Sequence, residues 1–132
     1  MALKIRENYS PNFDPIARKR KNIRFLIFHY TGMKSERKAI ERLTEIQSEV
    51  GTHYFVKKDG QIIRMVPDLY KAWHAGISYW CKYKSLNKYS IGIEISNPGH
   101  QFGYSNFKKK QIKNLIKLTK LLVKKYKIKK NH

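Results

Sequence analysis

Two residues of this chain, a histidine and a glutamate, stand beside apolar, strand-like segments where they could do chemistry. His29 directly follows the apolar run 25–28 and precedes Tyr30, Thr31 and Gly32. The end of a buried strand is rigid, and the loop behind it is where α/β proteins place ligands and catalytic groups. His29 is therefore a candidate ligand-binding or catalytic residue. The alternative is an interior histidine whose ring nitrogens are satisfied by its neighbours.

The candidate glutamate, Glu94, interrupts the apolar strand "IGIEI". In a regular strand Gly92 and Glu94 share one face, and the three isoleucines share the other. A carboxylate inside an apolar strand is costly unless it is paired, hydrogen-bonded or functional, and desolvation raises its pKa towards the range of a general base. Gly92 should leave room above the sheet for a ligand. The alternative is an edge strand with Glu94 facing water.

The remaining histidines are spread along the chain and form no local metal motif. No pair has the i, i+4 spacing of a zinc-binding helix, and there is no CxxC, so a zinc site would need distant segments. His74 lies in "AWHAG", where Trp73 supplies a flat apolar surface and Gly76 a turn. This pattern suits the wall of a binding cleft. Alternatively, the Trp-His pair plugs one end of the core. These histidines are His53, His74, His100 and His132.

The composition indicates one globular, strongly basic domain. The chain has 132 residues and a net charge of +20, from 29 Lys+Arg and 9 Asp+Glu. Such a charge favours polyanions, namely nucleic acid, an anionic membrane or an acidic cell-wall polymer, although a lysine-rich solvated surface explains it equally well. No apolar stretch has the length of a membrane span.

The single cysteine, Cys81, excludes an internal disulfide and fits a reducing compartment. We expect it to be a buried or incidental thiol. The N-terminal segment has no apolar core of a secretory signal, so we predict a cytoplasmic location, with a periplasmic location as the alternative.

The order of elements predicts an α/β fold with a mixed central β-sheet flanked by helices. Residues 1–21 should be an irregular basic arm, and 22–132 one domain. Ser35 should cap the first helix, Gly51 should end it, and Asp59-Gly60 should form a two-residue hairpin turn. The predicted strands lie near 23–28, 53–57, 61–66 and 90–96, with helices near 36–49 and 106–126, and the aromatic segment 69–89 should be a loop. The inner stripe of the second helix should comprise Ile112, Leu115, Ile116, Thr119, Leu122, Val123 and Tyr126.

From about residue 22 to its end, the chain resembles the zinc-dependent type 2 N-acetylmuramoyl-L-alanine amidases, relatives of phage T7 lysozyme and the peptidoglycan recognition proteins. The resemblance rests on "FLIFHYTGM", "VGTHYFVKKDGQIIRMVPDLYKAWHAGIS" and "SIGIEISNPGH". The segment "SIGIEISNPGHQFGY" is most similar to the branch that contains the bacterial AmiD-type enzymes.

The resemblance implies hydrolysis of the amide between N-acetylmuramic acid and the L-alanine of the peptide stem, with peptidoglycan or a muropeptide as substrate. It implies zinc on three protein ligands, the first being His29, and Glu94 as the catalytic residue. His53 and His74 match positions that shape the cleft and do not bind the metal. Predicted substrate contacts are Tyr30, Thr31, Trp73, His74 and Asn97.

The chain departs from the family pattern at its end, "KYKIKKNH". In relatives, a strand and a loop of the type G-H-S-D-I-A-P-x-R-K-x-D-P-G follow the basic helix and carry the other two ligands. His132 comes a few residues too early to match that histidine. We therefore expect weak zinc binding by this chain alone, and a sheet edge that invites dimerisation.

Three functions stay open from the sequence. The first is the amidase, the second a non-catalytic peptidoglycan-binding module, and the third a basic nucleic-acid-binding protein, which only the charge supports.

Overall fold

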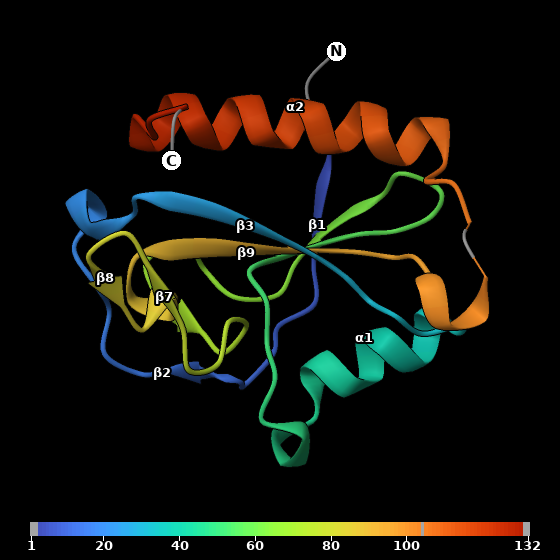
Figure 1. Cartoon of the computed structure of the whole chain (residues 1–132), viewed down its shortest axis with the longest axis horizontal. Helices are drawn as coiled ribbons and strands as arrows, with labels where there is room; N and C mark the ends of the chain where they lie inside the picture. Colours follow the sequence, from blue (N-terminus) through green and yellow to red (C-terminus); the bar gives the residue numbers. More distant parts are fainter. Residues whose placement is uncertain (1–2, 104, 131–132) are drawn as a thin grey trace.

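A computed structural model of the chain describes residues 3–103 and 105–130. Its centre is a five-stranded mixed sheet in the order β1-β5-β4-β9-β3, with α2 on one face and α1 on the other (Figure 1). The predicted α/β class is confirmed. The strands are β1 (Ile5–Glu7), β3 (Phe25–Tyr30), β4 (Tyr54–Val56), β5 (Ile62–Arg64) and β9 (Ser90–Ile95), and the helices are α1 (Glu36–Thr44) and α2 (Lys109–Tyr126).

The alternation of side chains along the strands divides the core into two layers. Tyr54 and Val56 of β4 pack with Leu118 of α2, whereas Phe55 between them packs with Leu43 of α1. In β9, Ile91, Ile93 and Ile95 belong to the α2 layer. Gly92 and Glu94 therefore share the opposite face, as the sequence predicted, and this face is the α1 side.

The first helix begins as predicted and ends early. Ser35 is its N-cap and accepts a hydrogen bond from the Lys38 backbone N–H. The helix stops at Thr44, followed by a 3-10 turn over Ile46–Ser48, so Gly51 does not terminate it. Gly51 instead allows a close approach, because a Cβ there would lie 2.4 Å from the Asn12 carbonyl oxygen.

The second helix is rotated relative to the predicted stripe. Ile112 and Ile116 are 36% and 49% exposed, whereas Gln111 and Leu118 are buried. Gln111 is tolerated in the core because its Nε2 donates to the carbonyl oxygens of Val56 and Ser96, at 3.2 and 2.8 Å. A hydrogen-bonded amide, rather than an isoleucine, thus points at the sheet.

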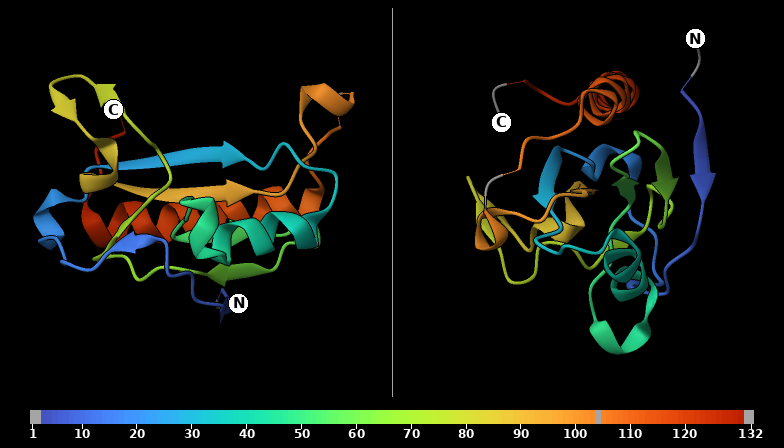
Figure 2. Two further views of the ribbon diagram at one scale, coloured as in Figure 1. Left: turned by 90° about the horizontal axis from the view of Figure 1, so that it is seen from below. Right: turned by 90° about the vertical axis from the view of Figure 1, so that its right-hand side faces the viewer.

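The N-terminal arm contains regular structure and closes one side of the sheet. β1 pairs in parallel with β5, and β2 (Phe13–Asp14) pairs antiparallel with β6 (Lys71–Ala72). Arg18, in the segment predicted to be an irregular basic arm, is only 8% exposed. The views in Figure 2 show β1 at the sheet edge opposite β3.

Two connections also differ from expectation. The hairpin connection at Asp59-Gly60 has five residues and not two, because the last strand pair is Val56 with Ile62. Gly60 nevertheless has the positive φ, 89°, that the predicted turn requires. The aromatic segment after β6 contains a small hairpin, β7 (Tyr79–Trp80) and β8 (Tyr83–Lys84). Cys81, at its tip, is exposed and not buried.

None of the helices in the described parts of the chain combines the length and apolarity needed to cross a bilayer.

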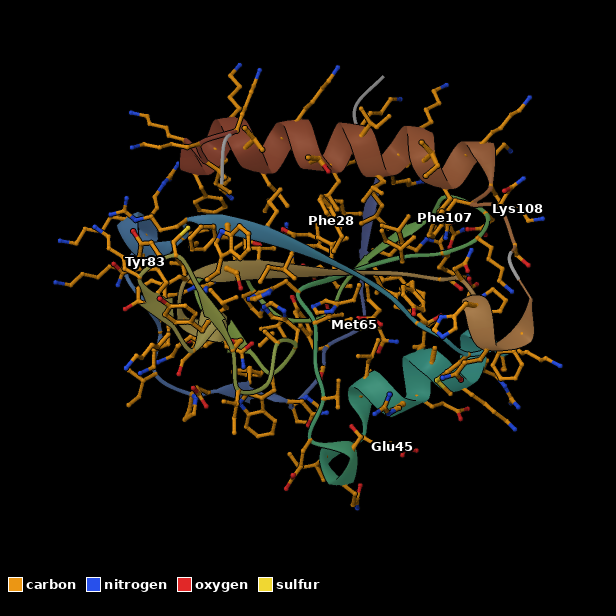
Figure 3. All side chains as sticks on the ribbon, viewed as in Figure 1. Phe28, Glu45, Met65, Tyr83, Phe107 and Lys108 are labelled. Atoms are coloured by element: carbon orange, nitrogen blue, oxygen red, sulfur yellow. The ribbon has the colours of Figure 1, made fainter. Side chains whose placement is uncertain are left out.

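Strand β3 is the other edge of the sheet and carries exposed apolar side chains beside it. Phe28 is 49% exposed and lies between the sheet and α2 in Figure 3. Asn114 of α2 donates to the Gly60 carbonyl oxygen on the β4–β5 side, and Ile112 and Ile116 lie about 160° around the helix from it. These isoleucines therefore face the β3 side, next to an edge strand of the sheet.

We expect two copies to associate through this edge as a weak dimer. Because each copy carries a net charge of +20, salt should strengthen the association by screening repulsion. Phe28→Lys should abolish it, and Leu69→Lys, at a 42% exposed leucine between β5 and β6, is the matched control. Sedimentation equilibrium at low and high salt tests this. A monomer at all concentrations and salts would contradict it.

Candidate active site

His29 and Glu94 are brought together by the pairing of β3 with β9. The two strands are parallel, and His29 is the register partner of Glu94. Register partners on adjacent parallel strands direct their side chains to the same face. Phe28, the neighbour of His29, points toward α2 (Figure 3), so His29 points to the opposite, α1 side. The side chains of His29 and Glu94 therefore share the α1 face of the sheet.

The surroundings of Glu94 favour its protonated form. Burial raises the pKa of Glu94 to about 7, and Arg42 opposes this only partly. None of the described residues donates a hydrogen bond to its carboxylate, so the lost hydration is not replaced. A carboxyl that titrates near neutral pH can both take up and release a proton. Burial also lowers the pKa of His29, which keeps its ring neutral.

The space above Gly92 is filled by His74, and not left for a ligand as predicted. A Cβ on Gly92 would lie 2.4 to 2.7 Å from three atoms of the His74 ring. From this position His74 Nδ1 lies 3.1 Å from His29 Nε2, and His74 Nε2 lies 3.0 Å from Ser90 Oγ. The absence of a side chain at Gly92 therefore leaves room for the His74 imidazole to lie beside His29.

His53 lies beneath this pair and is fully buried. Its Nδ1 accepts from the Gly92 backbone N–H at 3.0 Å, and its Nε2 lies 2.7 Å from the Tyr70 carbonyl oxygen. Burial and the charge of Arg18 lower the pKa of His53 to about 4. With both nitrogens engaged by the backbone, His53 is a structural residue, which agrees with its exclusion from the predicted ligand set.

Arg18 is the residue near the site that the sequence did not indicate. Its guanidinium donates to the carbonyl oxygens of Asn87, Ser90 and Asp68, at 2.9, 2.7 and 2.7 Å. Burial lowers its pKa to about 10, which leaves it charged. It joins the N-terminal arm to the start of β9, and only its place within "RKRK" was visible in the sequence.

Most of the predicted substrate contacts are held by residues other than His29 and Glu94. Trp73 is half-buried, and its Nε1 donates to Asp14 Oδ1 at 3.0 Å, which fixes the ring to β2. Thr31 and Asn97 hold two loops together, since Thr31 Oγ1 donates to the Asn97 carbonyl oxygen and accepts from the Asn97 N–H. Tyr30 follows His29 and so points to the other face, with its hydroxyl 3.3 Å from His100 Nδ1. Of this set, only His74 contacts His29 or Glu94.

Metal-binding side chains are too few here for a closed zinc centre. Among the described residues, no group of three or more His, Cys, Asp or Glu side chains could hold a metal ion. His29 is close to His74, whose outer nitrogen is already bonded to Ser90. Zinc sites in proteins use three or four such ligands, so the residues present do not fit one. The predicted mismatch of His132 lies outside the described residues.

The whole arrangement matches a known family. Residues 19–132 match the family model for N-acetylmuramoyl-L-alanine amidases. The chain belongs to this N-acetylmuramoyl-L-alanine amidase family.

Individual relatives agree with this assignment. The amidase AmiD of Escherichia coli is 37% identical over 119 residues, which cover 81% of this chain and 42% of that protein. The 1,6-anhydro-N-acetylmuramyl-L-alanine amidase AmpD of Haemophilus influenzae is 30% identical, covering 92% and 72%. The chain thus spans less than half the length of AmiD.

Solved structures show the same fold. The complex of E. coli AmiD with anhydro-N-acetylmuramic acid-L-Ala-D-γ-Glu-L-Lys aligns with a TM-score of 0.72 at 35% identity, covering 88% of this chain and 48% of that one. A structure of AmpD aligns with a TM-score of 0.75 at 22% identity, covering 96% and 80%.

We predict that Gly92→Ala destabilises the protein by about 1–3 kcal/mol, because the added methyl group overlaps the His74 ring. The double variant Gly92→Ala/His74→Ala should recover part of this loss, since it removes the overlapping ring. Chemical denaturation of the four proteins in the cycle measures the coupling. Additive losses would show that the two sites do not compete for space.

We predict that Glu94→Gln changes how stability depends on pH. The pKa of Glu94 is about 7 in the folded protein and 4.5 as its ordinary value, so the folded state binds more protons between these limits. The stability contributed by Glu94 is present below pH 4.5 and is lost as the pH rises through 7. The neutral glutamine should therefore be more stabilising at pH 8 than at pH 4, by on the order of 2 kcal/mol. Parallel pH profiles of unfolding free energy would contradict this.

Proposed function

We propose that this domain acts on the amide between the lactyl group of N-acetylmuramic acid and L-alanine in peptidoglycan or muropeptides. The observation that carries the proposal is the pairing of His29 with Glu94 on neighbouring parallel strands, with the Glu94 side chain half-buried and its pKa raised by desolvation to about 7. Membership of the amidase family and the fold shared with the AmiD complex support the same substrate class.

In this proposal Glu94 is the proton-transfer residue. As a carboxylate it takes a proton from a water molecule that attacks the amide carbonyl carbon. As a carboxylic acid it then delivers that proton to the nitrogen of the departing L-alanine. The desolvated position of Glu94 serves both steps, because a pKa near 7 leaves each form accessible at neutral pH.

His29 is proposed as a zinc-binding residue, as the family resemblance implies. It is the one family ligand among the described residues, and one imidazole does not hold zinc tightly. A non-catalytic module that binds muropeptides is therefore the second candidate, and the lack of a three-ligand set is the observation that favours it. Substrate contacts by Tyr30, Thr31, Trp73, His74 and Asn97 remain part of the proposal.

We predict that this 132-residue chain binds zinc with a dissociation constant no tighter than roughly 10 µM, because each missing ligand leaves the ion more hydrated. Hydrolysis of a muramoyl-L-alanine amide should be close to background. Calorimetric titration of chelator-treated protein with zinc measures the dissociation constant. His29→Ala is the test variant and His100→Ala the matched control. Chromatography of muropeptide products measures the rate of hydrolysis.

The two candidate functions give different results in the same experiment. Muropeptide binding without turnover supports the binding module. Turnover that needs zinc and is lost in Glu94→Gln supports the amidase. Tight stoichiometric zinc with His29→Ala unaffected would refute the assignment of His29.

A further inference from the structure

The hairpin of β7 and β8 projects beyond the five-stranded sheet (Figure 2). Trp80 pairs with Tyr83, so Cys81 and Lys82 form a two-residue turn at its tip. Cys81 has a positive φ of 54°, as tight hairpin turns require. The chain from residue 69 to residue 93 contains no Asp or Glu, so this projection carries only neutral and basic side chains.

The base of the hairpin is fixed to the rest of the protein. The Tyr83 ring packs edge-on against Phe25, with 5.1 Å between the ring centroids. Ser78 closes the base, because its Oγ accepts from the Leu86 backbone N–H at 2.8 Å and its carbonyl oxygen accepts from the Ser85 N–H at 2.9 Å. A projection held in this way loses little conformational entropy when a partner covers it.

Large apolar side chains on this projection face water. Ile77 is fully exposed, and Tyr79 and Trp80 are 66% and 53% exposed. Tyr79 and Trp80 are neighbours on one strand, so their side chains point to opposite faces of the hairpin. A flat partner, such as a sugar ring, a nucleobase or a protein surface, covers one face and leaves the other in water. A lipid interface surrounds the tip and covers both faces together.

The chemistry of the two rings also fits a lipid interface. Neither the Tyr79 hydroxyl nor the Trp80 indole N–H has a hydrogen-bond partner in the described parts of the chain. Tyr and Trp combine an apolar ring with a polar group, and they are enriched at the level of lipid headgroups, where one end is apolar and the other hydrated. Ile77 adds an aliphatic side chain that has no ring to stack on a base or a sugar.

A basic groove lies at the foot of the hairpin. Tyr89, which lines the groove, packs against Tyr83 with 4.9 Å between the ring centroids. Arg18 and four lysines also line it, and no acidic side chain of the described residues does. These lysines are Lys19, Lys21, Lys71 and Lys88. Lys82 and Lys84 of the hairpin are exposed. None of the six lysines forms an ion pair with a described residue, so their charge is available to an anionic partner.

We propose that the β7–β8 hairpin docks on an anionic lipid surface, with Ile77, Tyr79 and Trp80 inserted at headgroup level and the surrounding lysines on the lipid phosphates. Such a contact is peripheral and needs no spanning helix. Anionic lipids attract surface lysines, and the aromatic tip adds the apolar contact that charge alone lacks. The inference does not depend on the amidase proposal.

Docking by the hairpin also brings the candidate active site close to the bilayer. Asn87 belongs to the 3-10 turn Leu86–Lys88, which follows the hairpin directly. Its Oδ1 accepts from the backbone N–H groups of His74 and Ala75, at 3.3 and 2.9 Å. The hairpin and His74 are thus fixed to the same turn, so the site lies next to the docked surface.

The first test measures the depth of the hairpin tip in a bilayer. Cys81 is the only cysteine of the chain and is exposed, so a nitroxide spin label attaches there alone. The vesicles contain roughly one-quarter phosphatidylglycerol in phosphatidylcholine, with pure phosphatidylcholine as the control. On the anionic vesicles we expect the label to become more accessible to oxygen and less accessible to a water-soluble nickel complex. Unchanged accessibility on anionic vesicles overturns the proposal.

The second test removes the apolar contact. Trp80→Ser should weaken binding to the anionic vesicles roughly tenfold, as measured by co-sedimentation. Phe102→Ser is the matched control, because Phe102 is an aromatic residue of similar exposure, 48%, outside the hairpin. Its affinity should stay unchanged. An equal loss in the two variants shows that the hairpin has no special part in binding and overturns the proposal.

The third test separates the position of the lysines from the net charge. Lys82→Gln/Lys84→Gln should weaken binding roughly thirtyfold, because both lysines lie at the docked surface. Lys113→Gln/Lys120→Gln removes the same charge from exposed positions on α2 and should cost much less. Equal losses mean that net charge alone drives binding, which contradicts docking by the hairpin.

A nucleic acid is the competing partner, and random-sequence DNA is the probe for it. DNA binding that is lost in Trp80→Ser, together with no binding to anionic vesicles, identifies a nucleic acid as the partner and overturns the proposal. These readouts need no turnover, so an inactive chain that docks on anionic vesicles would refute the amidase alone.

Discussion

The parallel pairing of β3 with β9 is the constraint on which the site depends. The six-residue register sets His29 beside Glu94 and, through alternation, sends both to the face opposite α2. A shift of β9 by one residue would separate Glu94 from His29 and move its side chain into the apolar layer under α2, where Leu118 and Leu122 leave no space for an unpaired carboxylate. Burial of the β9 isoleucines against α2 therefore stabilises the register that places Glu94 beside His29.

The apolar periodicity of the sequence was enough to predict the sheet, the two helices and the shared face of Gly92 and Glu94. It failed where polar residues take core positions. The stripe of α2 was misplaced because Gln111 enters the core by bonding to two carbonyl groups, and the burial of Arg18, which three carbonyl oxygens hold inside, was not predicted. Such partners come from distant segments, so hydrophobicity along the chain does not reveal them.

The same limit explains the misreading of Gly92. The sequence correctly indicated that a small residue beside Glu94 makes room, but it could not say for what. The occupant, His74, comes from a connection 18 positions earlier and reaches β9 because the arm, β6 and the Asn87 turn hold that connection in place. The site on one strand is thus completed by a residue from a connection outside the five-stranded sheet.

The N-terminal location of β1 and β3 has a consequence for the order in which the protein can fold. β1 pairs with β5, some 57 positions later, and β3 must wait for β9, some 65 positions later. Arg18 bonds across 72 positions. Contacts of such long sequence separation slow folding, because loop closure must precede any gain from pairing. During synthesis the first third of the chain therefore leaves the ribosome without partners, and its apolar strand stays open to chaperones until β9 emerges.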